Sequence, residues 1–154
     1  MSNYNLKNFM ISGLKKNDTL TFKGIDTFKD ENGVPIPLKF KQISRTEVED
    51  IRKKFVHKTP AVDKEGNYII RNGRIINDID VDYDSFTDEL IVETMVQPDL
   101  RDKELLDFYG VYAGTDLLHI LFKGDDYRYI DGCAAQAADI APIKEENLIK
   151  ELKN

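Results

Sequence analysis

The sequence is poor in the residues that most often carry covalent or metal chemistry. It has one cysteine, Cys133, two histidines, His57 and His119, and no tryptophan. A single cysteine excludes an internal disulfide, and nothing else indicates an oxidising compartment. A zinc site would need ligands at a regular spacing, which these three residues do not provide. We therefore interpret them as structural or surface residues and expect neither a metal nor another cofactor.

Long apolar runs and a positive net charge are missing as well. No segment approaches the roughly 20 apolar residues that span a bilayer, and no basic start with an apolar stretch behind it indicates a signal peptide. The net charge is −6, whereas nucleic acids and anionic membranes are bound through basic faces. We expect a cytoplasmic protein that binds neither.

The sequence also lacks the motifs of common enzyme classes. We find no nucleophile elbow, phosphate loop or dinucleotide fingerprint. No nucleophile, base and orienting group can be assembled from the residues present. We therefore predict that the chain is not an enzyme.

What the chain does have is the composition of one folded domain. Of its 154 residues, 41% are hydrophobic and 32% are charged, which is enough apolar material for a single core. We assign residues 1–141 to one domain. We assign residues 142–154 to a charged tail that is either flexible or a frayed helix.

Two alternating segments near the N-terminus are typical of strands. Apolar side chains occupy every second position from Leu20 and again over 36–43, and the Asp-Glu-Asn-Gly sequence at 30–33 predicts a turn between them. Pro35 and Pro37 cannot donate to a ladder, so we expect the second strand to be an edge at its start.

Helical spacing dominates elsewhere. Residues 4–11 predict a short amphipathic helix ended by Gly13. A capping box of Ser44 and Glu47 predicts a helix over 45–57, ended by Thr59-Pro60.

From about 84 onward we expect four helices, the first stopped by Pro98 and the second by Gly110. Their apolar faces carry Phe86, Leu90, Ile91 and Met95; then Leu105, Leu106 and Tyr109; then Leu117, Leu118, Leu121 and Phe122; and last Tyr127, Ile130, Ala134 and Ala137 or Ala138.

The order of these elements predicts the fold class. Strands come first and helices after, which indicates an α+β fold. We expect a small antiparallel sheet and hairpins in the N-terminal half, packed with a C-terminal cluster of about four helices.

The segment between the two halves has two interpretations. Asn72-Gly73 between apolar pairs predicts a hairpin, with a mobile surface loop as the alternative.

Four alternating aspartates follow: Asp78, Asp80, Asp82 and Asp84. With Glu89 at the twelfth position they imitate a calcium-binding EF-hand loop, but Tyr83 stands where that loop needs a glycine. We favour an exposed strand face followed by a helix that Asp84 or Ser85 caps.

Two blocks of residues, in this order, resemble the XkdN-like tail assembly chaperones of phages and phage-like elements. The first block, 28–57, contains the Asp-Glu-Asn-Gly turn, Pro35-Ile36 and the Ile43-Ser44 cap. The second, 86–130, contains the sequences Asp-Lys-Glu-Leu and Tyr-Gly-Val followed by a leucine pair. The segment from 60 to 82 is longer than the resemblance leads us to expect.

The resemblance implies a chaperone that acts in the cytoplasm of the bacterial host. Such a protein transiently binds the tape measure protein, keeps it soluble for tail-tube assembly and is absent from the mature virion. The major tail tube protein is a second candidate partner. The alternative is a structural tail component, either tube-associated or a completion protein. A calcium-dependent regulatory module and an enzyme rank behind it.

Large apolar side chains in the helical half are the candidate anchors for a protein partner. Ordinary core packing is the alternative for each of them. The candidates are Leu105, Phe108, Tyr109, Tyr112, Leu118 and Phe122.

Overall fold

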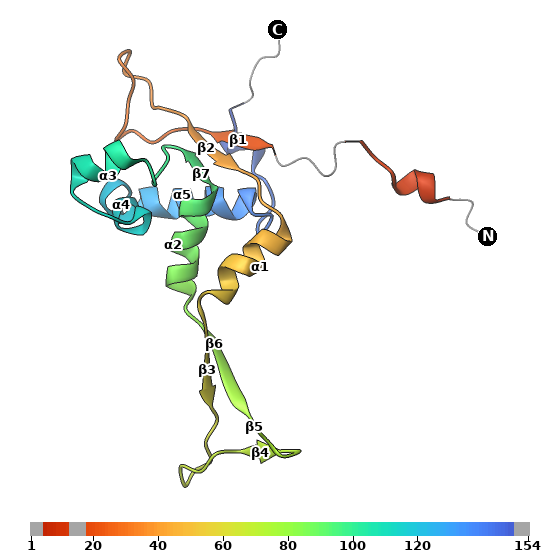
Figure 1. Ribbon diagram of the computed structural model, residues 1–154. Coiled ribbons are helices and arrows are strands. Elements are labelled where there is room, and N and C mark those ends of the chain that lie inside the picture. Colours follow the sequence, from red (N-terminus) through yellow and green to blue (C-terminus); the bar gives the residue numbers. More distant parts are fainter. Residues whose placement is uncertain (1–4, 13–17, 150–154) are drawn as a thin grey trace.

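The computed structural model describes residues 5–12 and 18–149 and shows a body from which a β-arm projects (Figure 1). The helices are α1 (Arg45–Lys53), α2 (Tyr83–Thr94), α3 (Lys103–Tyr109), α4 (Gly114–Leu121) and α5 (Asp125–Ala137), with 3-10 turns η1 (Leu6–Phe9) and η2 (Glu145–Asn147). The strands are β1 (Thr19–Phe22), β2 (Leu38–Lys41), β3 (Val56–Pro60), β4 (Ile70–Arg71), β5 (Arg74–Ile75), β6 (Asn77–Val81) and β7 (Met95–Gln97). The predicted α+β class is confirmed.

The sheet of the body has three antiparallel strands in the order β1-β2-β7. Strand β2 is therefore central at Lys39 and Phe40, whereas its first residue, Leu38, pairs with β1 alone, as the expected edge at its start requires. Pro35 and Pro37 both precede its first residue, so neither removes a hydrogen bond from the ladder. Phe22 and Phe40 lie on the core side of the sheet and meet edge to face with ring centroids 5.6 Å apart.

The main core lies between this sheet and helices α2, α4 and α5. Its largest fully buried apolar side chains are Phe22, Phe40, Ile91, Leu100, Leu117, Leu118, Phe122 and Ile130. On α5 the buried residues include Ala134 and Ala137, whose small side chains let α2 and the sheet approach closely. A second cluster joins α1 to α2 through Ile43, Val48, Ile51, Phe86, Leu90 and Ala138.

Helix α1 begins where the capping signal predicts and ends earlier than expected. The Ser44 hydroxyl oxygen accepts a hydrogen bond from the backbone N–H of Glu47 at 3.2 Å. The helix ends at Lys53 because Val56–Pro60 pairs with β6 as strand β3. Pro60 is thus a strand residue and does not terminate the helix.

Helix α2 is also shorter than its apolar pattern predicts. Its cap is Asp82, one of the alternating aspartates, and not Asp84 or Ser85. The Asp82 carboxylate accepts the backbone N–H of Ser85 at 3.2 Å and its hydroxyl at 2.7 Å. The helix ends before Pro98 because Met95–Gln97 joins the sheet as β7. The predicted helices that carry Leu105, Leu117 and Tyr127 are all present as α3, α4 and α5.

The arm consists of the β3–β6 ribbon and, at its end, the β4–β5 hairpin (Figure 1). Asn72 and Gly73 have φ angles of 50° and 74°, the left-handed pair that a two-residue hairpin turn requires, so the hairpin prediction is confirmed. Backbone hydrogen bonds from Ile69 N–H to the Ala61 carbonyl and from Ala61 N–H to the Ile76 carbonyl hold the hairpin to the ribbon.

The chain termini differ from expectation. The predicted N-terminal helix is a single 3-10 turn, and Gly13, which we expected to end it, lies outside the described residues.

After residue 141 the chain runs beside β1. Lys23 N–H donates to the Asn147 carbonyl at 2.8 Å, and Ile149 N–H donates to the Thr21 carbonyl at 2.7 Å. Up to Ile149 this segment is thus hydrogen-bonded to β1, and the assignment of residues 142–154 to a tail stays a prediction. The domain division at 141 stays a prediction.

Two glycines provide a matched test of the packing. A methyl group at Gly24 would lie 2.1 Å from the carbonyl oxygen of Ile36, whereas one at Gly132, within α5, would meet nothing within 4 Å. We expect Gly24→Ala to lower the free energy of unfolding by about 1–3 kcal/mol. We expect Gly132→Ala to raise it by about 0.5–1 kcal/mol, because alanine favours the helix. Urea denaturation measures both, and a neutral Gly24→Ala variant would contradict the close approach.

Candidate functional site

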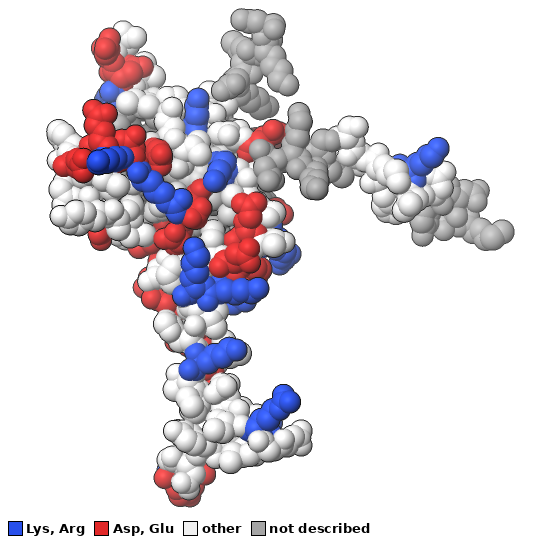
Figure 2. All heavy atoms as spheres, viewed as in Figure 1, with Lys and Arg blue, Asp and Glu red and all other residues white. Residues whose placement is uncertain are grey.

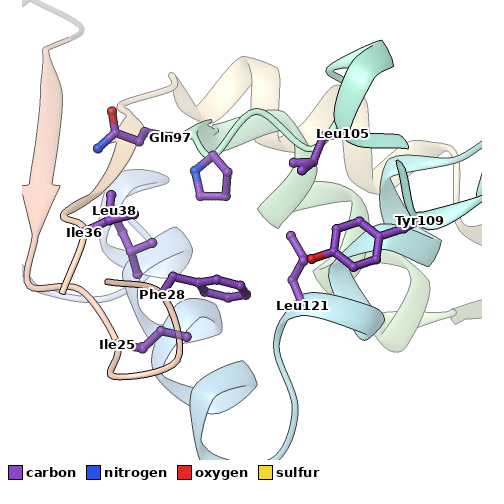
Figure 3. Close-up of a pocket in the computed structure, with 9 residues that line it drawn as sticks. Ile25, Phe28, Ile36, Leu38, Gln97, Leu105, Tyr109 and Leu121 are labelled. Carbon is purple, nitrogen blue, oxygen red and sulfur yellow. The ribbon is translucent and has the colours of Figure 1, made fainter. Parts of the chain in front are cut away.

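An apolar pocket of about 220 Å³ opens on the body between the 25–38 segment and helices α3 and α4 (Figure 3). Gln97 provides an amide and Tyr109 a hydroxyl, and the other lining side chains are apolar. The pocket is lined by Ile25, Phe28, Ile36, Leu38, Gln97, Pro98, Leu105, Tyr109 and Leu121. Such a surface suits an apolar side chain of a partner better than a polar substrate.

The loop wall of the pocket is held by a tight turn. The Asp30 carboxylate accepts the backbone N–H groups of Asn32 at 2.8 Å and Val34 at 3.0 Å. Beyond the turn, Ile36 N–H donates to the Phe28 carbonyl at 2.9 Å. These bonds close the two sides of the loop on each other, so that both Ile36 and Phe28 face the pocket.

The floor of the pocket is joined to the core. The Phe28 ring packs edge to face on the buried ring of Phe122, with centroids 5.9 Å apart. On the strand side, Gln97 Nε2 donates to the Pro37 carbonyl at 2.6 Å and ties β7 to the start of β2. The loop wall is thereby fixed to the same core that positions α4.

Helix α3 forms the opposite wall. Asp102 caps it by accepting the backbone N–H of Leu105 at 3.0 Å, and Gly110, with a φ of 70°, ends it. Leu105 and Tyr109 are four residues apart on one face of this helix, and both point into the pocket. Phe108 packs edge to face on Tyr109, at 4.9 Å between centroids, and remains 79% exposed.

An acidic rim adjoins the pocket. Asp99, Asp102 and Glu104 line a shallower depression that includes Phe108 and shares Leu105 with the pocket. Figure 2 shows acidic side chains gathered over the α3 end of the body. We call these three carboxylates and Phe108 the acidic rim.

The arginine next to the rim is directed elsewhere. Arg101 forms ion pairs with Glu93 and, at 3.2 Å, with Glu89, both on helix α2. The hydrogen bond from Arg101 lowers the pKa of Glu93, so this pair stays ionised at neutral pH. It anchors the chain between β7 and α3 to α2 and holds the rim in place.

The six predicted partner anchors fall into four environments. Leu105 and Tyr109 line the pocket, and Phe108 belongs to the acidic rim. Tyr112 is 99% exposed in the segment after α3. Leu118 and Phe122, however, are fully buried in the core and are not accessible to a partner in this conformation, so we remove them from the candidate surface.

Sequence reasoning missed the loop side of the pocket. Phe28 and Ile36 are separated by the turn at 30–33, and their joint position depends on the hydrogen bonds that close the loop. The signal that could have found them is the pair of large apolar residues directly flanking an Asp-Glu-Asn-Gly turn.

A polar cluster joins three helices on another side of the body. Asp88 Oδ1 accepts the Tyr127 hydroxyl at 2.7 Å, and Asp88 Oδ2 lies 2.7 Å from His119 Nε2. The His119 and Tyr127 rings stack with centroids 5.4 Å apart. Burial and the Asp88 carboxylate raise the pKa of the Tyr127 hydroxyl, so it remains a hydrogen-bond donor. The cluster clamps α2, α4 and α5 together.

The other candidate chemical groups occupy structural positions. Burial raises the pKa of the Cys133 thiol to about 12, which keeps it protonated and unreactive. His57 lies in β3, opposite Asp80 of β6.

Within residues 5–12 and 18–149, no group of three or more histidine, cysteine or acidic side chains is placed to hold a metal ion. In the same ranges, no helix is long and apolar enough to cross a membrane.

Asp131 on α5 gives a test of the charge around this cluster. Burial and the neighbouring Asp88 carboxylate raise the pKa of Asp131 above its ordinary value. Because the folded-state pKa is raised, ionised Asp131 costs stability at neutral pH, and the cost disappears as acid protonates it. We expect Asp131→Asn to raise the thermal midpoint at pH 7 by about 1–2 °C, with the gain shrinking toward pH 3. A lower midpoint at pH 7 would contradict this.

Comparisons with known proteins identify the family. A family model described as phage XkdN-like tail assembly chaperone protein, TAC, matches residues 6–153. No curated protein matches the sequence. The crystal structure of the protein YqbN is similar, with a TM-score of 0.65 and 19% identity, covering 90% of this chain and 98% of that chain. At that identity the likeness shows a shared fold alone. Because the family model spans nearly the whole sequence, the chain belongs to the family of phage XkdN-like tail assembly chaperones.

Proposed function

We propose that this chain transiently binds the tape measure protein of a phage or prophage and keeps it soluble in the host cytoplasm until the tail tube assembles. The observation that carries the proposal is the apolar pocket with its exposed neighbour Phe108. The proposed role requires no covalent chemistry, and we infer that the chain is not an enzyme.

The pocket suits a helical client. A tape measure protein is a long helical polypeptide, and apolar stripes on its helices would associate with each other if left uncovered. Leu105, Tyr109 and the opposing loop offer a concave apolar surface into which a few side chains of one helix face fit. A contact of this size is reversible, because a small interface with few anchors gives modest affinity.

The acidic surface contributes solubility. When the chain binds its client, its net charge of −6 makes the complex negatively charged. Copies of the complex then repel one another, which keeps them in solution. A chaperone of this kind leaves before the particle is complete, so we propose that it is absent from the mature virion. The major tail tube protein is the second partner that we propose, since the client must be passed to the assembling tube.

Co-expression with the tape measure protein tests the function. We expect the wild-type chain to keep the tape measure protein in the soluble fraction of the lysate. The double variant Phe108→Ser, Tyr109→Ser should reduce the soluble fraction several-fold, because it removes two aromatic anchors from the binding surface. The matched control is Tyr68→Ser, Tyr83→Ser, which removes two exposed aromatics away from the pocket.

Two results would contradict the proposal. Equal solubility of the tape measure protein with and without this chain would remove the chaperone role. Recovery of this chain in purified tails, in stoichiometric amounts, would favour the structural alternative of a tube-associated or completion protein.

A further inference from the structure

The β-arm is a part of the chain that lacks a second packing layer. Within residues 56–81 only Ala61 is buried. Five large apolar side chains of the arm are exposed: Val62, Tyr68, Ile70, Ile75 and Ile79. A two-stranded ribbon is marginally stable in water by itself, and exposed apolar residues gathered in one place mark an interaction surface.

The end of the arm has two chemically different faces. In the β4–β5 hairpin Ile70 pairs with Ile75, and Arg71 pairs with Arg74. Residues directly opposite each other share one face of a hairpin, whereas the next pair lies on the other face. The hairpin tip, defined as residues 70–75, therefore presents two isoleucines on one face and two arginines on the other.

The arm cannot be covered by its own body. Figure 1 shows the hairpin tip at the far end of the arm, directed away from the sheet and from helices α3 and α4. Helices α3 and α4, which contribute to the walls of the apolar pocket, lie at the opposite end of the molecule from the hairpin tip (Figure 1). Within the described residues, no element of the body brings an apolar layer to this tip.

We propose that the hairpin tip of one copy docks in the acid-rimmed pocket of a second copy. The isoleucine face supplies branched apolar side chains of the kind that the pocket accepts. Arg71 and Arg74 flank the turn of the hairpin, and their long side chains reach past its edge to Asp99, Asp102 and Glu104 of the second copy, which lie beside the pocket. Arginine is suited to this pairing because its planar group binds carboxylates through two hydrogen bonds.

This contact joins different surfaces of identical chains. Such head-to-tail contacts do not close on themselves unless the rotation allows a ring, so association grows into open chains with concentration. The hairpin tip and a client helix would compete for the same pocket, which would keep the pocket covered when no client is present. The contact itself requires no tape measure protein and stands or falls independently of the proposed function.

Sedimentation velocity of the full chain without any partner tests the contact. We expect the average mass of the wild-type protein to rise above the 17.7 kDa of one chain as concentration increases. Arg71→Glu, Arg74→Glu should raise the dissociation constant by about tenfold or more, because it places negative charge against the rim. Asp99→Lys, Glu104→Lys should do the same from the other side. The control for the arginine variant is Lys53→Glu, Lys54→Glu. It makes the same change in net charge as Arg71→Glu, Arg74→Glu but places it where α1 ends, before the arm begins.

Mixing the two charge-reversed variants gives the sharpest result. Each hairpin tip then meets a rim of opposite charge on the other variant, so we expect the mixture to associate although neither variant does so alone. The proposal is overturned if the wild-type chain stays monomeric up to about 1 mM, if Arg71→Glu, Arg74→Glu associates like the wild type, or if the mixture stays monomeric. None of these results decides whether the chain binds the tape measure protein, so the proposed function is tested separately.

Discussion

The packing of Phe28 on Phe122 is the contact on which the candidate binding surface depends. Phe122 is part of the buried core, at the end of α4, whereas Phe28 belongs to the loop between β1 and β2. Through this contact the loop is fixed at a set distance from α3, and an apolar pocket remains between them. Gly24 permits the same arrangement from the other side, because only a residue without a side chain fits against the Ile36 carbonyl.

Local signals in the sequence predicted the parts of the fold that depend on few neighbours. The Ser44 cap, the Asn72-Gly73 hairpin and the Gly110 helix end are set by backbone conformation and nearby hydrogen bonds. Strands β3 and β7 were missed because each follows directly on a helix and is defined by a distant pairing partner. The helical spacing of apolar residues runs on to Phe55 and Met95, past the last residue of each helix, so it could not reveal where the chain leaves the helix.

The candidate site could be predicted only in part for a related reason. The helical period identifies the apolar face of a helix but not whether another element covers it. Leu105 and Leu118 have equivalent positions in that pattern, yet α3 lies at the surface beside a pocket and α4 lies against the core. The loop side of the pocket has no periodic signature at all. Family membership supplies the biological setting, and the packing supplies the surface at which a client would bind.

The central claim is that the tape measure protein binds at the pocket between the 25–38 segment and helix α3. Hydrogen–deuterium exchange of this chain, free and in complex with the tape measure protein, tests it most directly. The account predicts that slowed exchange is concentrated in residues 25–38 and 99–112, with little change in α1. Unchanged exchange in both segments, together with protection elsewhere on the body, would contradict it.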